Sequence, residues 1–295
     1  MNIRNITLLS VSNRLLMKVF YPLCNLLTEL FSKDYKIITA SVTPLIHNWG
    51  DDMSCKIINF INPGLKTMVK RYSFNIRNYD DYLCIGSIIS WMTSPKSIIW
   101  GSGVVYPNQK LKFKPKKVLA VRGPLTRQYL MEQGVECPEI YGDPALLFPR
   151  FYTPPVLTSV NKYGLGIIPH FRDKNNPLIK KLENNKDILI IDVTNITPWH
   201  KFIDQITSCN YIVSSSLHGI ILSDAYGIPN TWVEFKGGER KRFAFQDYML
   251  SVGRDEHEGF LIDETTTIED LIQECQKWRG IDIDLDKLLS VCPFR

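Results

Sequence analysis

Apolar residues follow two alternating patterns along the chain, short β-type runs and longer segments with helical spacing. In the first half, the runs are residues 36–42, 82–85, 96–100 and 118–121, and the helical patterns are 51–61 and 124–133. In the second half, the runs are 163–169, 188–193, 211–213 and 231–235, and the helical patterns are 177–184, 198–208, 268–277 and 285–291. Strands that alternate with helices predict parallel sheets joined by right-handed crossovers. The predicted fold class is therefore α/β.

A change of pattern near the middle of the chain predicts a boundary between two domains. Residues 148–161, FPRFYTPPVLTSVN, contain three prolines and show no periodicity, which is typical of a linker. We expect an N-terminal Rossmann-like domain over residues 1–150 and a C-terminal one over residues 151–295, facing each other across a cleft. Ligands bind preferentially in such clefts.

The composition fits a soluble globular protein and excludes several other classes. The chain has 295 residues, of which 44% are hydrophobic and 22% charged, and these are ordinary values. A formal net charge of +5 suits an anionic substrate or a loose contact with an acidic membrane surface. No block of lysines and arginines supports nucleic-acid binding. The seven cysteines are scattered without C-x-x-C spacing, so we expect the reducing cytoplasm and no zinc site.

The N-terminal segment, residues 1–31, is apolar but interrupted by charges and by a proline. Its longest uncharged piece, residues 19–28, is too short to cross a bilayer. No small-residue cleavage site follows it, which argues against a secretory signal. The segment predicts either an amphipathic core helix or an interfacial helix that touches the inner face of the membrane.

The most informative segment is residues 211–230, YIVSSSLHGIILSDAYGIPN. A strand breaks into three serines, and His218-Gly219 opens a helical pattern that ends at Gly227. Ligands of open α/β sheets bind at the carboxyl ends of strands, and helix N-termini there attract anions. A histidine at this turn can bind an anion and transfer a proton near neutral pH. We therefore predict an active site for a phosphorylated or carboxylated small molecule, with a half-buried structural histidine as the alternative for His218.

Polar clusters lie at the ends of other predicted strands. In the segment HNWGDD, Asn48 or Asp51 can cap the following helix. The alternative is that Asp51 faces the substrate and orients or deprotonates a sugar hydroxyl. The Gly86-Ser87 and Gly101-Ser102-Gly103 segments form either tight turns or places where backbone approaches a ligand closely.

Two basic positions offer contacts to an anion. Arg122 follows an apolar strand and precedes a helix with Pro124 in its first turn, so its guanidinium either binds a carboxylate or phosphate or forms a surface ion pair. Asp143, in Gly142-Asp143-Pro144, fits a structural role better. The loop His170-Phe171-Arg172-Asp173-Lys174 is either solvated or an anion-binding loop on the cleft. The charges of Lys236, Arg240, Lys241 and Arg242 are either a solvated run or a contact to a lipid diphosphate.

Taken in order, these clusters resemble the polysaccharide pyruvyltransferase family. The matching stretches cover roughly residues 43–248: Asn48-Trp49-Gly50-Asp51, Ile85-Gly86-Ser87, Trp100-Gly101-Ser102-Gly103, Val121-Arg122-Gly123-Pro124-Leu125-Thr126-Arg127, Gly142-Asp143-Pro144-Ala145-Leu146-Leu147, Gly166-Ile167-Ile168-Pro169-His170, Ser215-Ser216-Leu217-His218-Gly219 and Phe245-Gln246-Asp247-Tyr248. Each stretch is weak alone, but the ordered set is specific.

The resemblance implies a GT-B-like fold and transfer of a pyruvyl group from phosphoenolpyruvate to a sugar, usually as a cyclic ketal across two hydroxyls. Such enzymes modify capsular polysaccharides, exopolysaccharides and cell-wall glycans, often on lipid-linked precursors. We expect a galactose-type acceptor, phosphoenolpyruvate as co-substrate, and neither cofactor nor metal.

We expect the site residues to divide by substrate. The catalytic residues are His218, Asp51 and Arg122. Phosphoenolpyruvate is expected to contact Arg122, Ser215, Ser216, His218, Gly219, His170 and Arg172. The acceptor is expected to contact Asn48, Asp51, Ser87 and Ser102.

One position departs from the family pattern. Many members carry Arg-Leu-His where this chain has Ser216-Leu217-His218, and that arginine is expected to hold phosphoenolpyruvate. Its absence leaves the anion to Arg122, to the serines and backbone of the turn, or to the basic loop. A GT-B glycosyltransferase that uses a nucleotide sugar, and a non-catalytic glycan-binding or assembly protein, remain alternatives, because a fold does not fix a function.

Overall fold

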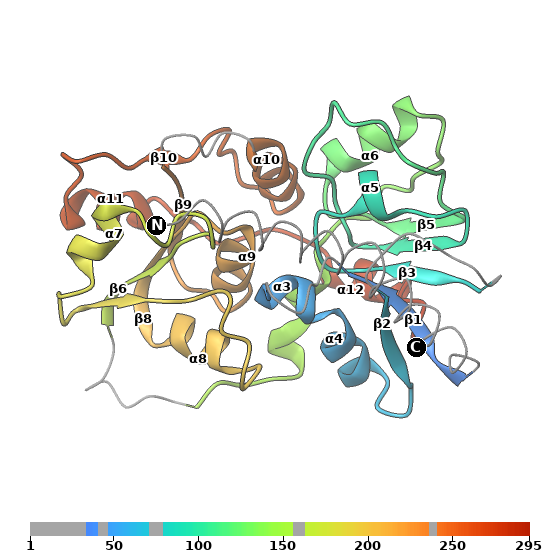
Figure 1. The fold of residues 1–295 in the computed structure, drawn as a ribbon, viewed down its shortest axis with the longest axis horizontal. Helices are drawn as coiled ribbons and strands as arrows, with labels where there is room; N and C mark the ends of the chain where they lie inside the picture. Colours follow the sequence, from blue (N-terminus) through green and yellow to red (C-terminus); the bar gives the residue numbers. More distant parts are fainter. Residues whose placement is uncertain (1–33, 41–46, 71–78, 156–162, 236–240) are drawn as a thin grey trace, which may run out of the picture.

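The computed structural model describes residues 34–40, 47–70, 79–155, 163–235 and 241–295. The predictions for the N-terminal segment 1–31, for most of the proline-rich stretch after residue 155, and for Lys236 and Arg240 lie outside these ranges. The described chain forms two lobes, each built on one parallel sheet (Figure 1).

The first lobe is built on five strands in the order β2-β1-β3-β4-β5, all parallel. The strands are β1 (Lys36–Thr39), β2 (Thr67–Lys70), β3 (Asp81–Leu83), β4 (Ser97–Trp100) and β5 (Lys117–Ala120). The helices between and after them are α3 (Trp49–Asp52), α4 (Ser54–Ile61), α5 (Ile89–Met92) and α6 (Pro124–Glu132).

The second lobe repeats this design with the strand order β10-β9-β8-β6-β7, again all parallel. Its strands are β6 (Tyr163–Ile168), β7 (Ile188–Ile190), β8 (Cys209–Ser214), β9 (Asn230–Glu234) and β10 (Phe260–Leu261). Its helices are α7 (Pro177–Leu182), α8 (Lys201–Thr207), α9 (Leu217–Ala225), α10 (Arg242–Ser251) and α11 (Ile268–Gln276). The predicted α/β class with two Rossmann-like parallel sheets is confirmed.

Both sheets have the same doubly wound order. In each lobe, the second strand pairs with one side of the first strand, and the third strand pairs with the other side of the first strand. The chain therefore changes direction between β1 and β3 in one sheet and between β6 and β8 in the other. Ligands of such sheets bind outside the carboxyl ends of the strands at this switch point. The topology thus marks one ligand-binding edge in each lobe.

Four elements were absent from the sequence prediction: β2, α5, β10 and α10. The first three have four residues or fewer, too short for a periodic pattern. Helix α10 is longer, but Asp247 is fully buried within it, and a charged residue on the buried face breaks the apolar spacing that predicts a helix.

The predicted linker begins too early. Residues Pro144–Arg150 form a 3-10 helix, η3, that is capped by the Asp143 carboxylate through Ala145 N at 2.9 Å. Phe148 is fully buried, and its ring centroid lies 5.0 Å from that of Trp49. Of the three prolines in the predicted linker, Pro149 therefore lies inside this 3-10 helix between the lobes.

The C-terminal segment returns to the first lobe, where the chain also ends (Figure 1). Helix α12 (Leu285–Ser290) contributes the Leu288 carbonyl that accepts from Trp100 Nε1 at 3.0 Å. The ring of Phe294 packs 4.9 Å from that of Tyr82. The chain thus crosses between the lobes once after η3 and again between α11 and α12.

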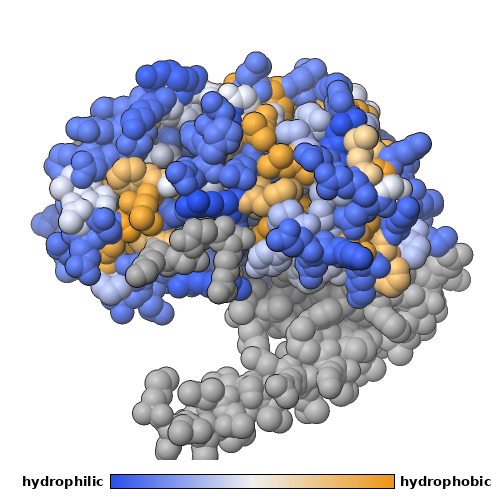
Figure 2. Space-filling model, turned by 90° about the horizontal axis from the view of Figure 1, so that it is seen from above, coloured by the Kyte–Doolittle hydropathy of each residue, from blue (hydrophilic) through white to orange (hydrophobic). Residues whose placement is uncertain are grey.

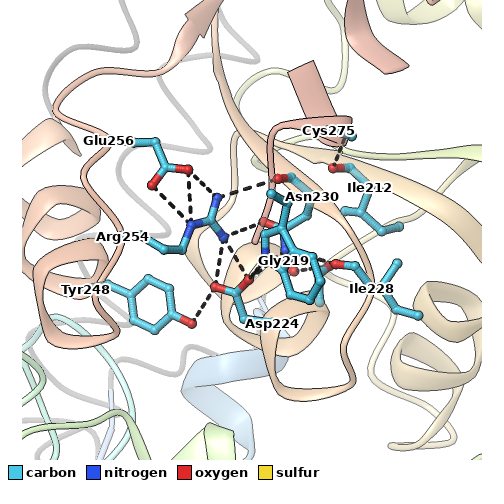
Figure 3. Close-up of polar contacts among 11 residues, drawn as sticks. Ile212, Gly219, Asp224, Ile228, Asn230, Tyr248, Arg254, Glu256 and Cys275 are labelled. Atoms are coloured by element: carbon cyan, nitrogen blue, oxygen red, sulfur yellow. Dashed lines mark hydrogen bonds and ion pairs between the residues drawn. The ribbon is translucent and has the colours of Figure 1, made fainter. Parts of the chain in front are cut away.

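A buried polar network joins α9, β9 and α10 within the second lobe (Figure 3). The Asp224 carboxylate accepts from Arg254 Nη1 at 2.7 Å, from Tyr248 Oη at 2.8 Å and from Asn230 Nδ2 at 2.7 Å. Since every partner is a donor and the carboxylate is buried, the network is satisfied. It holds α10, and with it the start of that helix, in a fixed position.

Candidate active site

A cavity of about 240 Å³ lies between the lobes, at the switch points of both sheets. Side chains from both lobes line it: Asn48, Asp51, Ser87, Ile88, Trp91, Val105, Tyr106, His170, Phe171, Ser216, Leu217, His218, Lys241, Ala244 and Phe245. Six of the predicted site residues are among them: Asn48, Asp51, Ser87, His170, Ser216 and His218. On the outer face seen in Figure 2, a band of hydrophobic residues crosses the middle of a mostly hydrophilic surface.

Helix α3 brings two predicted residues to the cavity in different roles. Asn48 is its N-cap, and its Oδ1 accepts from Gly50 N at 3.3 Å. Asp51 lines the cavity instead. Burial raises the pKa of Asp51 to about 6, and the nearby charge of Lys241 opposes this shift. The carboxylate is therefore mostly ionised at neutral pH and can accept a proton.

His218 lies in the first turn of α9, with its ring packed against the backbone of Gly50 in the other lobe. A Cβ atom at Gly50 would lie 2.0 Å from His218 Cε1, so only glycine leaves room for the ring. His218 is 7% exposed, and its Nε2 has no hydrogen-bond partner among the described residues. Burial, together with the positive charges of Arg122 and Lys241, lowers its pKa to about 3. A neutral ring with an unsatisfied buried nitrogen is suited to binding a ligand.

Arg122 is placed behind the cavity wall, neither in contact with the cavity nor on the surface. It is completely buried, and its Nε donates to Asp247 Oδ2 at 3.0 Å and its Nη2 to the Val104 carbonyl at 2.8 Å. Its Nη1 donates to Ser87 Oγ, and Ser87 lines the cavity. Arg122 therefore acts on the cavity through the position of the Ser87 hydroxyl and through its charge.

The glycines of the first lobe make this arrangement possible. A Cβ at Gly103 would lie 2.3 Å from the Arg122 guanidinium carbon, and one at Gly123 would lie 1.8 Å from the Asp247 carbonyl oxygen. Both distances are impossible for real side chains. Glycine at these positions therefore allows other groups of the protein to lie directly against the backbone.

His170 and Lys241 form a pair on the second-lobe side of the cavity. Lys241 Nζ lies 2.6 Å from His170 Nε2. Burial, with the charges of Lys241 and Arg172, lowers the pKa of His170 to about 3, so the ring is neutral and accepts from the ammonium. His170 N donates to Ser215 Oγ at 2.9 Å, which holds the loop against β8.

The remaining predicted residues do not line the cavity. Ser102 Oγ donates to the Gly86 carbonyl at 2.6 Å, and Ser215 Oγ donates to Asp173 Oδ2 at 2.7 Å. Gly219 packs against Ser214, where a Cβ would lie 2.3 Å from Oγ. Arg172 is exposed. These four residues support the loops that carry the cavity side chains.

Nine of the lining residues were not among the predicted site residues, and Lys241, Trp91 and Tyr106 are three of them. Lys241 belongs to the charge run that was interpreted as solvated or lipid-binding. Trp91 and Tyr106 are 37% and 41% exposed. Each follows a Gly-Ser segment within a few residues, and an aromatic residue at such a position was the available sequence signal for a binding surface.

In the part of the chain that the structure describes, no helix is both long enough and apolar enough to span a membrane.

Fold and site together define a two-domain, doubly wound α/β protein with titratable side chains gathered in the cleft between its domains. The model of the polysaccharide pyruvyl transferase family matches residues 19–236, and the chain belongs to this family. This confirms the resemblance seen in the ordered segments.

Two known proteins are similar over most of their length. An uncharacterized protein of Acanthamoeba polyphaga mimivirus is 32% identical over 221 residues, which are 70% of this chain and 72% of that protein. The crystal structure of a functionally uncharacterized protein from Klebsiella pneumoniae covers 81% of this chain and 96% of its own, with 14% identity and a TM-score of 0.44.

Proposed function

We propose that this protein transfers the pyruvyl group of phosphoenolpyruvate to two hydroxyls of a sugar, forming a cyclic ketal. The observation that carries the proposal is the convergence of Asp51 and His218, from the two lobes, on one cavity at both switch points. Family membership supports the pyruvyl transfer and the phosphoenolpyruvate donor. The volume supports a small donor, since about 240 Å³ corresponds to roughly eight waters at about 30 Å³ each.

The donor side of the reaction is assigned to the turn before α9. Ser216 is the N-cap of this helix and lines the cavity together with His218, so an anion there meets a helix N-terminus. His218 is neutral in the empty cavity, but a bound phosphate dianion favours the imidazolium and raises its pKa. His218 then holds the proton that the methylene carbon of phosphoenolpyruvate takes up.

The acceptor side is assigned to Asp51 and Ser87. Protonation makes the central carbon electrophilic, and a sugar hydroxyl adds to it while its proton passes to the Asp51 carboxylate. The bond between the central carbon and the phosphate oxygen breaks, and inorganic phosphate leaves with the bonding electrons. A second hydroxyl adds to the same carbon and closes the ketal, its proton returns to His218, and the proton on Asp51 leaves with the phosphate. Arg122 has no direct part in these steps and positions Ser87.

The acceptor ring is assigned to the cavity mouth, where Trp91 and Tyr106 expose their aromatic faces. We propose a galactose-type residue, carried on a lipid-linked precursor of a capsular polysaccharide or exopolysaccharide. The corresponding location is the cytoplasm, with peripheral contact at the inner face of the membrane.

The test is incubation with phosphoenolpyruvate and a panel of lipid-linked galactose-type acceptors, with phosphate release and the mass of the acceptor measured together. We expect equimolar phosphate and pyruvylated acceptor from the wild-type protein, and loss of both in Asp51→Asn and His218→Ala. His257→Ala is the control, because this histidine is 70% exposed. Release of a nucleoside diphosphate from a sugar nucleotide would instead indicate a glycosyltransferase, and acceptor binding without turnover a binding protein.

A further inference from the structure

The cavity contains one side chain that carries a positive charge at neutral pH among the described residues that line it. That side chain is Lys241, at the start of α10. The other titratable groups of the lining are Asp51, the phenol of Tyr106 and two neutral histidines, His170 and His218. A donor with a phosphate and a carboxylate requires at least one cation, because burying an uncompensated anion is costly.

The arginines around the cavity are committed to other groups. Arg122 is bound to Asp247, Val104 and Ser87 behind the wall. Arg242, the next residue along the chain, pairs with Glu234 at 2.8 Å and Glu258 at 3.0 Å. Arg172 is exposed outside the lining.

We propose that Lys241 is the residue that binds an anionic group of phosphoenolpyruvate, with His170 as the acceptor that aims its ammonium group into the cavity. This inference rests on the proposed function, since it concerns the donor of the same reaction.

The geometry of the pair supports this role. A lysine ammonium has three donors and no acceptor, so the 2.6 Å contact with His170 Nε2 uses one N–H. His170 is itself buried, and the bond from its backbone N to Ser215 Oγ fixes the backbone that carries the ring. The ammonium is thereby oriented and retains donors for a ligand, and charge-assisted bonds of this kind are the strong ones.

The charges that face Lys241 predict a pH dependence of donor binding. Burial and Arg172 lower its pKa, whereas Asp51 and Asp173 raise it, and the result is a pKa of about 8. Neutral His170 adds no charge. Lys241 is protonated below this pH, so affinity for phosphoenolpyruvate is expected to be retained at neutral pH and to fall as the pH rises through about 8.

The experiment is calorimetric titration with phosphoenolpyruvate in the absence of acceptor. Loss of a charge-assisted bond worth about 1.5–3 kcal/mol corresponds to an affinity about 10- to 150-fold weaker for Lys241→Ala at pH 7. Lys241→Arg is expected to recover most of this loss and to bind above pH 8 as well as at pH 7, because arginine stays protonated. The control is Lys287→Ala, at an exposed position of α12, which should bind like the wild type.

Two results would overturn the assignment in distinguishable ways. Wild-type affinity in a folded Lys241→Ala variant, or a wild-type affinity that does not change between pH 7 and 9, removes Lys241 from the donor site and leaves the proposed function intact. Absence of both phosphoenolpyruvate binding and turnover in the wild-type protein overturns the proposed function together with this inference. Thermal unfolding of each variant identifies loss of binding caused by misfolding, and Lys241→Gln then provides a milder substitution.

Discussion

An alanine at position 50 tests whether catalysis depends on where the His218 ring lies. A Cβ atom there would be 2.0 Å from Cε1 and 2.1 Å from Nδ1 of that ring. Ordinary contact begins at 3.4 Å, so the ring or the turn of α3 must retreat by at least 1.4 Å, the difference between 3.4 and 2.0 Å. The substitution moves the imidazole without removing it.

The expected effect on activity is large and the effect on folding is small. Misplacing a catalytic group by about 1 Å can cost about 100-fold, so we expect kcat/KM to fall at least that far, which is about 2.7 kcal/mol of transition-state stabilisation. Alanine is better than glycine in a helix by about 1 kcal/mol, whereas overpacking costs about 1–3 kcal/mol. The free energy of unfolding should therefore change by less than about 2 kcal/mol.

The assay is phosphate release from phosphoenolpyruvate with a saturating acceptor, alongside urea unfolding of the same samples. The matched control is Gly64→Ala, since a Cβ at Gly64 would meet only Asn62 Oδ1, at 3.7 Å. A folded Gly50→Ala variant with near wild-type kcat/KM would refute the reasoning, because it would show that the ring can move without consequence.

Three further predictions concern the cavity and its supports. Asp247→Asn leaves the buried charge of Arg122 uncompensated, so urea unfolding should show a loss of about 3–5 kcal/mol; a loss below about 1 kcal/mol, the level of a surface pair, would contradict it. The pH profile of kcat/KM should be bell-shaped, rising through about pH 6 as Asp51 ionises and falling through about pH 8 as Lys241 loses its proton. An unchanged acid limb in the residual activity of Asp51→Asn would show that Asp51 is not the group that ionises there. Trp91→Ala should raise the acceptor KM about 2- to 10-fold and leave phosphoenolpyruvate affinity unchanged in calorimetry, whereas the reverse result would place the aromatic face on the donor side.

The sequence was sufficient to predict the two parallel sheets and six of the residues that line the cavity. Each of these residues, such as Ser87 and Ser216, follows a predicted strand or opens a predicted helix. The carboxyl ends of parallel strands meet at one edge of a sheet, so local patterns alone bring such residues together. Asn48, predicted as a cap or as an acceptor contact, both caps α3 and lines the cavity.

The partners that arrive from distant parts of the chain were beyond prediction from local patterns. The Arg122 guanidinium meets Asp247, 125 positions away, because α10 packs against α6. Lys241, next to the start of α10, likewise meets His170, 71 positions away. The sequence predicted Arg122 as an anion ligand or a surface ion pair, and Lys241 as a solvated charge or a lipid-diphosphate contact. Tertiary packing instead buries Arg122 and places Lys241 in the cavity lining.

The two passages of the chain between the lobes have a consequence for motion. A single tether would let the lobes twist about it, whereas two separate connections restrict them to a hinge about the line that joins the connections. The aromatic contacts of Trp49 with Phe148 and with Phe202, at 5.0 and 5.6 Å, resist that hinge as well, since apolar interfaces suppress domain motion. We therefore expect the two lobes to move little relative to each other and the cavity between them to keep its shape when a ligand binds.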